Sequence, residues 1–227
     1  TAGMFENDAL ELLGELFPRH PAVILCGGSG LYINALCYGI DNLPRVNPAL
    51  RDELRNKYRE EGLNSIREML KELDPVYYGR ADLNNPKRIL KGLEISIMTG
   101  KPYSAFLTGH RKERPFGMLL LGLDRPRDEL YTRINTRVER MVEQGLVEEA
   151  RKLYPLRHLN ALQTVGYREL FSHFDGNFSL EHAIEKIKDH TRKYARKQLT
   201  WFRKNREINW FHPDDLQAIR KLINRAV

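Results

Sequence analysis

The segment richest in potential chemistry is residues 190–207, HTRKYARKQLTWFRKNRE, in which basic and aromatic side chains are interleaved. Residues 187–206 hold eight Lys or Arg and one acid, and the whole chain has a net charge of +7. On a helical wheel Arg192, Arg196 and Arg203 share a stripe about 40° wide, with lysines behind it. Because guanidinium groups bind phosphate through two hydrogen bonds, this pattern predicts a surface for a polyanion such as a nucleic-acid backbone. The alternative is an ordinary solvated helix face.

The aromatic residues of this segment divide into two groups. Phe202 falls on the apolar side of the helix with Ala195 and Leu199, so we predict that it belongs to the core rather than to a platform for bases. Tyr194 and Trp201 lie at the boundary and fit either role.

Three other short segments could bind an anion or a nucleic acid. GGSG at 27–30 follows an apolar run and opens a helical pattern, so its backbone amides and Ser29 could face an anion or a polar substrate group. The alternative is a turn that is rich in glycine for steric reasons only. Arg133 and Arg137 are spaced i,i+4 and fit either a diphosphate or plain solvent exposure. QTVGYRE at 163–169 is a candidate for reading a nucleic-acid sequence. The phosphate-loop pattern G-x-x-x-x-G-K-[ST] does not occur in the 227 residues.

These side chains need elements to position them. Apolar runs at 22–26 (AVILC), 117–123 (GMLLLGL) and 208–211 (INWF) predict buried strands of a parallel sheet covered by helices. A helical pattern covers 6–17, and another starts after the glycine turn. Three further predicted helices begin where a capping side chain precedes proline, at Asn47-Pro48, Asp74-Pro75 and Asn85-Pro86, and the last of them ends near Gly100. Another predicted helix runs from about Pro126 to near Gly145.

Composition narrows the class of protein. No apolar run approaches the roughly 18 residues of a membrane-spanning helix, so we expect no membrane association. The first residues lack the basic start of a secretory signal. Cys26 and Cys37 form no paired framework, which favours a reducing cytoplasm, and neither has metal-ligand spacing.

Taken together, the motifs resemble the tRNA dimethylallyltransferase (IPP transferase) family. The resemblance rests on ordered segments that extend from about residue 5 to residue 211: GGSGLYI at 27–33, NNPKRILKGLEI at 84–95, RDELYTRINTRVERMVEQGLVEEA at 127–150, QTVGYRE at 163–169 and RKYARKQLTWFRK at 192–204. Five motifs in order are far more specific than any one of them.

The resemblance implies an α/β fold, with a core similar to P-loop kinases and a helical insertion. We expect the core to comprise residues 1–41 and 86–227 and the insertion to comprise residues 42–85. The sheet of the core is expected to be incomplete, and most residues are expected to be helical. The implied reaction transfers a dimethylallyl group from its diphosphate to N6 of the adenosine immediately 3′ of a tRNA anticodon, after that base is flipped out. Expected partners are a tRNA anticodon stem-loop and dimethylallyl diphosphate, the expected cofactor is Mg²⁺, and we expect a cytoplasmic monomer.

Roles come from the resemblance residue by residue. Ser29, at a position where threonine is more usual in the family, is expected to help place the reacting amine within the turn formed by Gly27, Gly28 and Gly30. Arg133 and Arg137 match arginines expected near the diphosphate, so these two and Ser29 form the predicted catalytic set. Matches to tRNA-contacting segments are Lys87, Arg88, Lys91, Gln163, Thr164, Gly166, Tyr167, Arg168, Arg192, Arg196, Lys197, Gln198, Thr200, Trp201 and Arg203.

One departure from the family pattern limits these expectations. Family members carry a phosphate loop and an aspartate general base in a segment that precedes the position of Thr1, and the 227 residues contain neither motif. We therefore expect the magnesium ligands mostly in that segment, no metal ligand in this chain, and no prenyl transfer by the 227 residues alone. Two alternatives stay open: a non-catalytic RNA-binding helical module, and part of a nucleotide or small-molecule kinase, which would leave the basic helix without a role.

Overall fold

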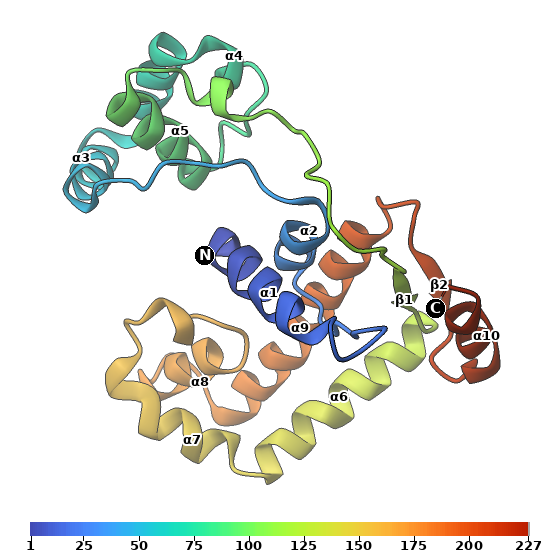
Figure 1. Cartoon of the computed structure of the whole chain (residues 1–227). Helices are drawn as coiled ribbons and strands as arrows, with labels where there is room; N and C mark the ends of the chain where they lie inside the picture. The colour runs from blue at the N-terminus through green and yellow to red at the C-terminus, as the bar shows by residue number, and fades with distance from the viewer. Residues whose placement is uncertain (227) are drawn as a thin grey trace. The chain divides into compact units, whose positions relative to one another are not determined.

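The structure is a computed structural model that describes residues 1–226. Figure 1 shows the whole chain, which forms two compact units. Unit 1 comprises Thr1–Arg19 and Leu31–Phe116, and unit 2 comprises His20–Gly30 and Gly117–Val227.

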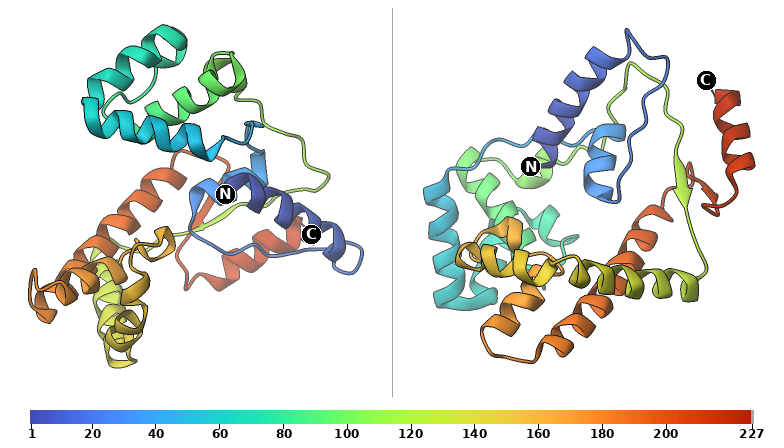
Figure 2. Two further views of the ribbon diagram at one scale, coloured as in Figure 1. Left: turned by 90° about the vertical axis from the view of Figure 1, so that its left-hand side faces the viewer. Right: turned by 90° about the horizontal axis from the view of Figure 1, so that it is seen from below.

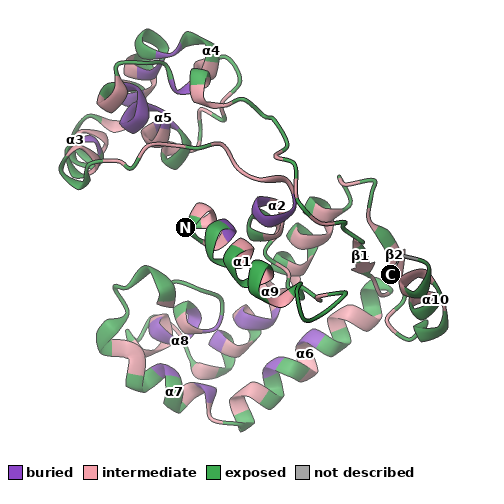
Figure 3. Cartoon of the chain, viewed as in Figure 1, coloured by how far each residue is buried: buried purple, intermediate pink, exposed green. Residues whose placement is uncertain are grey.

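Unit 1 is helical, and most of its interior lies between two long helices. Its elements are α1 (Ala2–Leu16), α2 (Gly30–Tyr38, whose first residue belongs to unit 2), α3 (Pro48–Leu73), α4 (Pro75–Tyr78), α5 (Pro86–Thr99) and the 3₁₀ turn η1 (Tyr103–Phe106). Burial along α3 and α5 in Figure 3 marks their shared core, which consists of Leu54, Ile66, Leu70, Ile89 and Leu93. The predicted insertion therefore shares its core with α5, which follows it; the division at residue 85 stays a prediction.

Helix boundaries in unit 1 follow local capping chemistry. Asn47 Oδ1 accepts a hydrogen bond of 2.9 Å from the Ala49 amide, and Asp74 Oδ1 accepts one of 2.9 Å from the Tyr77 amide, as predicted. Gly100, with φ 66°, ends α5 in the left-handed conformation. Asn85 differs from the prediction, because its side chain makes no capping hydrogen bond in the described part of the chain.

A buried carboxylate ties the start of unit 1 to its end. Glu6 on α1 accepts hydrogen bonds from Arg114 Nη2 at 2.8 Å and Lys112 Nζ at 3.0 Å. Arg114 also donates to the carbonyl oxygen of Ala35 on α2 at 2.8 Å. Glu6 is 3% exposed, so one buried ionic group joins α1, α2 and the segment that leads into unit 2.

Unit 2 contains the sheet and a helical subdomain. Its elements are β1 (Leu121–Leu123), α6 (Arg127–Glu143), α7 (Leu146–Leu153), the 3₁₀ turns η2 (Tyr154–Leu156) and η3 (Asn160–Leu162), α8 (Tyr167–Phe174), α9 (Leu180–Phe202), β2 (Asn209–Phe211) and α10 (Leu216–Ala226). Helices α6 to α9 surround a core formed by Val138, Leu146, Ala150, Leu170, Phe171, Ala183 and Ile187. Figure 2 shows α8 and α9 joined by a short turn, and the two helices pack on each other.

The sheet is smaller than the sequence predicted. β1 and β2 pair in parallel, with Leu121 opposite Asn209 and Leu123 opposite Phe211. The prediction of a parallel sheet is confirmed, but strand 117–123 is reduced to its last three residues. The strand predicted at 22–26 is wrong, because those residues pair with no strand within residues 1–226 and Ile24 is 89% exposed. An apolar run needs a hydrogen-bonded neighbour to become a strand.

Within the described residues, every helix is too short or too polar to cross a bilayer.

Candidate functional site

Helix α9 carries most of the predicted binding residues, and its first half is firmly anchored. Ser179 caps the helix by accepting a hydrogen bond from the His182 amide at 3.3 Å, and Ala183 and Ile187 are buried in the unit 2 core. Lys188 Nζ donates to Glu139 on α6 at 2.9 Å. Hydrogen bonds from Lys188 to two glutamates raise its pKa, so it stays charged as a link between the helices. Because the first half of α9 is anchored in the unit 2 core, its second half holds its cationic side chains in a defined position.

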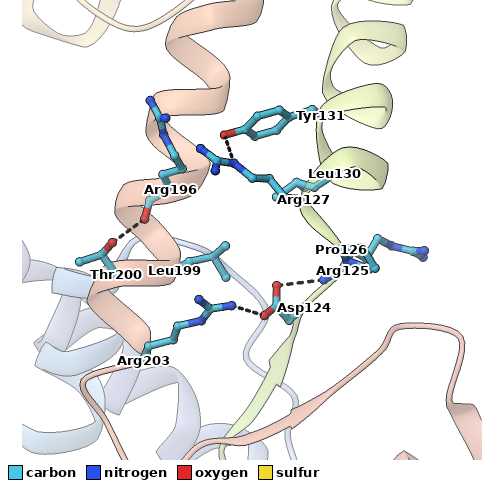
Figure 4. Close-up of a pocket in the computed structure, with 10 residues that line it drawn as sticks. All are labelled: Asp124, Arg125, Pro126, Arg127, Leu130, Tyr131, Arg196, Leu199, Thr200 and Arg203. Carbon is cyan, nitrogen blue, oxygen red and sulfur yellow. Dashed lines mark hydrogen bonds and ion pairs between the residues drawn. The ribbon is translucent and has the colours of Figure 1, made fainter.

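A cavity of about 670 Å³ lies where α6 begins, β1 ends and the second half of α9 passes (Figure 4). It is lined by Asp124, Arg125, Pro126, Arg127, Leu130, Tyr131, Arg196, Leu199, Thr200 and Arg203. The carboxyl end of a parallel strand is where α/β proteins commonly bind ligands. Here that end leads directly into Asp124 and Arg125.

Two of the four cavity arginines are neutralised by acids. Arg203 Nη2 lies 2.5 Å from Asp124 Oδ2, and the largely buried Arg125 pairs with Glu129 and with Asp214. Arg127 and Arg196 have no acidic partner among the residues that the structure describes. The cavity therefore has an excess of positive charge suited to an anion with phosphate geometry.

Tyr131 places a phenol oxygen and a ring among these cations. Its Oη accepts a hydrogen bond of 3.0 Å from Arg127 Nε, visible in Figure 4. The guanidinium carbons of Arg127 and Arg192 lie 5.3 and 5.9 Å from its ring centroid. The hydrogen bond from Arg127 lowers the pKa of Tyr131, assisted by the positive charges of Arg196 and Arg192. The phenol orients the arginine without neutralising it.

The glycine turn at 27–30 is attached to α9. Gln198 Nε2 donates to the carbonyl oxygen of Gly28 at 2.8 Å, and the Trp201 indole packs so closely on Gly30 that an added Cβ would lie 2.2 Å from the ring. Ser29 is exposed, and its hydroxyl has no hydrogen-bond partner within residues 1–226. The turn thus offers a free hydroxyl beside the basic helix.

The predicted diphosphate arginines lie on α6. Arg133 and Arg137 are exposed and one turn apart, and neither forms a hydrogen bond or ion pair with any described residue. They are not among the cavity-lining residues, and no hydrogen bond or ion pair joins them to Ser29 in the described structure. Both guanidinium groups therefore keep their N–H donors for an added anion, although the charge of Arg133 also helps to lower the pKa of Asp214.

The predicted turn at 163–168 leads into α8. Gln163 Nε2 donates to the Arg157 carbonyl oxygen at 2.6 Å, and the Arg168 amide donates to the Thr164 carbonyl oxygen at 3.1 Å. Tyr167 hydrogen-bonds Glu149 on α7. Gly166 is buried with φ 107°, a conformation that a side chain would strain.

The remaining predicted residues lie on α9 and on α5. Arg192 donates to Asn135 Oδ1 on α6 at 2.9 Å, Thr200 donates to the Arg196 carbonyl oxygen at 2.9 Å, and Lys197 is exposed. On α5 of unit 1, Lys87 and Arg88 are exposed and Lys91 is partly buried. Burial lowers the pKa of Lys91.

Sequence reasoning missed several residues of this site. Asp124, Arg125, Arg127 and Tyr131 line the cavity but were not predicted. The sequence did carry a signal for them: the charged pair Asp124-Arg125 directly follows the apolar run 117–123, and polar residues at the carboxyl end of a parallel strand commonly face a ligand.

No group of three or more acidic, histidine or cysteine side chains arranged to hold a metal occurs in residues 1–226.

An arginine-lined cavity at the carboxyl end of a parallel strand, on a helix bonded to a glycine turn, is the arrangement expected of an α/β protein with a site for phosphorylated ligands. The chain belongs to the IPP transferase family, whose sequence model matches residues 1–205.

Known relatives agree with this assignment. The chain is 53% identical over 219 residues to tRNA dimethylallyltransferase 2 of Parabacteroides distasonis, covering 96% of this chain and 73% of that protein. It is 48% identical to tRNA dimethylallyltransferase 1 of Bacteroides fragilis, covering 100% of this chain and 75% of that protein. The solved tRNA isopentenylpyrophosphate transferase of Bacillus halodurans is similar with a TM-score of 0.64 and 33% identity, covering 100% of this chain and 72% of that chain.

Proposed function

We propose that this protein modifies tRNA by transferring a dimethylallyl group from dimethylallyl diphosphate to the exocyclic amine of an adenosine. One observation of the structure supports this proposal most directly. The same helix, α9, lines an arginine-rich cavity through Arg196 and Arg203 and holds the glycine turn through Gln198. A single rigid element can therefore bind a nucleic-acid backbone and position a small polar site.

The reaction sets clear demands on the site. A bond forms between the adenosine N6 and the first carbon of the dimethylallyl group, and the bond from that carbon to the diphosphate oxygen breaks. Pyrophosphate leaves, and the amine gives up one proton to a base. Negative charge therefore builds up on the leaving diphosphate, where arginines stabilise it most effectively.

We assign this stabilisation to Arg133 and Arg137. Both are exposed, lie one helical turn apart and form no hydrogen bond or ion pair with a described residue, so neither is committed to a structural ion pair. We assign to Ser29 a hydrogen bond to the substrate, since its hydroxyl stands exposed in the glycine turn. The base that accepts the amine proton is not assigned to a residue of this chain.

The RNA partner is expected to be an anticodon stem-loop with adenosine immediately 3′ of the anticodon. Its phosphates would contact the α9 arginines, the 163–168 turn and the start of α5. We further propose that one chain acts alone, in the cytoplasm where tRNA is found. Mg²⁺ is proposed to enter with the prenyl diphosphate, because this ion is commonly bound by substrate phosphates and few carboxylates; residues 1–226 hold no cluster built for it, and no step is assigned to it.

A complementation experiment tests the proposed reaction. The natural gene that encodes this chain is expressed in a bacterial strain that lacks its own tRNA prenyltransferase, and the nucleosides of the isolated tRNA are analysed by mass spectrometry. We expect dimethylallyladenosine with the natural gene and with Arg140→Ala, and a strong loss with Arg137→Ala. Expressed protein that binds tRNA without producing the modified nucleoside would favour a binding module and contradict the proposal.

A further inference from the structure

Glu169 is a buried carboxylate that gathers groups from two helices. It is 3% exposed, and its Oε2 accepts a hydrogen bond of 2.7 Å from the buried amide of Gly166. Its Oε1 accepts from Arg168 Nη2 at 3.1 Å and contacts His190 Nδ1 on α9 at 2.6 Å. One carboxylate therefore connects the 163–168 turn to the basic helix.

The carboxylate of Glu169 fixes the position of one proton on His190. Burial raises the pKa of Glu169, but hydrogen bonds from His190 and from the Gly166 amide lower it below its ordinary value, so the group is ionised near neutral pH. An ionised carboxylate only accepts hydrogen bonds, so Nδ1 of His190 must carry a proton. Nε2 then accepts a hydrogen bond when the ring is neutral and donates one when the ring is protonated. Nε2 has no partner in the described part of the chain, and the His190 side chain is 30% exposed.

Arg168 is oriented in the same way but keeps free donors. Its Nε and Nη2 both point at Glu169 Oε1, at 3.4 and 3.1 Å. A guanidinium has five N–H donors, and Nη1 is not used by any described residue. The Arg168 side chain is 53% exposed, so its outer edge can meet a phosphate.

We propose that Glu169 positions Arg168 and His190 as a ribose-phosphate site, in which Arg168 binds a phosphate and His190 Nε2 forms a hydrogen bond with a ribose 2′-hydroxyl, a group that can both donate and accept. This proposal rests on the proposed function, because it requires that the chain binds RNA. Arg168 and His190 contact the same carboxylate oxygen, Glu169 Oε1, so the two side chains lie next to each other. The 2′-hydroxyl is the group by which a protein distinguishes RNA from DNA. Glu169 is a positioning residue, since it would not touch the RNA itself.

Affinity for two versions of one hairpin tests the proposal. Binding of the natural protein to an anticodon stem-loop is measured with the RNA and with the DNA of the same sequence. We expect His190→Ala to weaken RNA binding about three- to tenfold and leave DNA binding unchanged, since one hydrogen bond is lost. Arg168→Ala should weaken both and reduce the dependence of binding on salt by about one ion. Glu169→Gln should combine the two effects: it should weaken binding of both hairpins, weaken RNA binding more than DNA binding, and reduce the salt dependence. In the Arg168→Ala/His190→Ala double variant, Glu169→Gln should have no further effect.

The control separates positioning from loss of stability. Glu6→Gln removes an equally buried carboxylate from unit 1, and we expect it to lower the melting temperature without changing the ratio of RNA to DNA affinity. Equal losses on RNA and DNA for His190→Ala, or no loss, would overturn the proposal while the proposed function stands. Failure of the unaltered protein to bind the RNA hairpin would overturn the proposed function as well.

Discussion

The side-chain amide of Gln198 donates a 2.8 Å hydrogen bond to the carbonyl oxygen of Gly28. Three residues further along α9, the Trp201 indole covers Gly30. These two contacts join the basic helix to the glycine turn, although about 170 residues of sequence separate them. The position of Ser29 therefore depends on α9.

The contact between Gly30 and Trp201 predicts a graded response to alanine in the turn. A Cβ at Gly30 would lie 2.2 Å from the indole, whereas a Cβ at Gly27 would have no atom within 4 Å. We expect Gly30→Ala to destabilise the chain by about 1–3 kcal/mol because the ring must move, and Gly27→Ala to change stability little. Urea unfolding of the two variants checks this, and equal stabilities would show that the indole does not pack on the turn.

Some of this arrangement was predictable from the sequence because its causes are local. Asn47 and Asp74 cap helices through their own side chains, and Gly100 ends α5 because glycine adopts positive φ at little cost. Helical periodicity places Gln198 on the same side of α9 as Phe202, and the Gln198 side chain faces the glycine turn.

Other features depend on contacts between distant segments, which the sequence does not display. Residues 22–26 have the composition of a buried strand, but strand formation depends on a neighbour, and none pairs with them within residues 1–226. The cavity arises where Tyr131 and Arg127 on α6 meet Arg196 on α9. The joint contact of Glu169 with Arg168 and His190 could not be predicted either, because it requires the packing of α8 on α9.

The buried cluster around Glu6 predicts a dependence of stability on pH. Burial raises the pKa of Glu6, but hydrogen bonds from Arg114 and Lys112 lower it below the ordinary value of 4.5. A carboxyl with a lowered pKa stabilises the folded state above its unfolded pKa, and this contribution is lost as the pH falls through the folded pKa. Glu6→Gln should cost about 3–5 kcal/mol near neutral pH, because Arg114 remains buried without its partner.

Denaturation at two pH values checks the role of Glu6. The stability difference between the natural protein and Glu6→Gln should shrink as the pH falls below 4.5. Glu61→Gln, which breaks the exposed pair with Lys57, should change stability little at either pH. A difference for Glu6→Gln that stays the same at every pH would contradict the ionic account.

The free arginines of α6 predict a localised anion site. We expect Arg133→Ala and Arg137→Ala each to weaken binding of inorganic pyrophosphate by about tenfold or more, since charge-assisted hydrogen bonds are lost. Stability should not change, because neither side chain has an ion-pair partner among residues 1–226. Calorimetric titration of pyrophosphate measures this, with Arg140→Ala, an exposed arginine of the same helix, as the matched control. An equal loss for Arg140→Ala would indicate diffuse attraction instead of a site.

The central claim is that the arginine face of α9 binds the backbone of an anticodon stem-loop. The most direct test is the affinity for a labelled stem-loop over a series of salt concentrations, for the natural protein, Arg196→Ala and Lys193→Ala. Arg196 has no acidic partner in the described structure, whereas Lys193 pairs with Asp189 at 2.7 Å on the same helix. We expect Arg196→Ala to weaken binding and to reduce the salt dependence by about one ion, and Lys193→Ala to change neither. Identical affinities and salt dependences for all three proteins would contradict the claim.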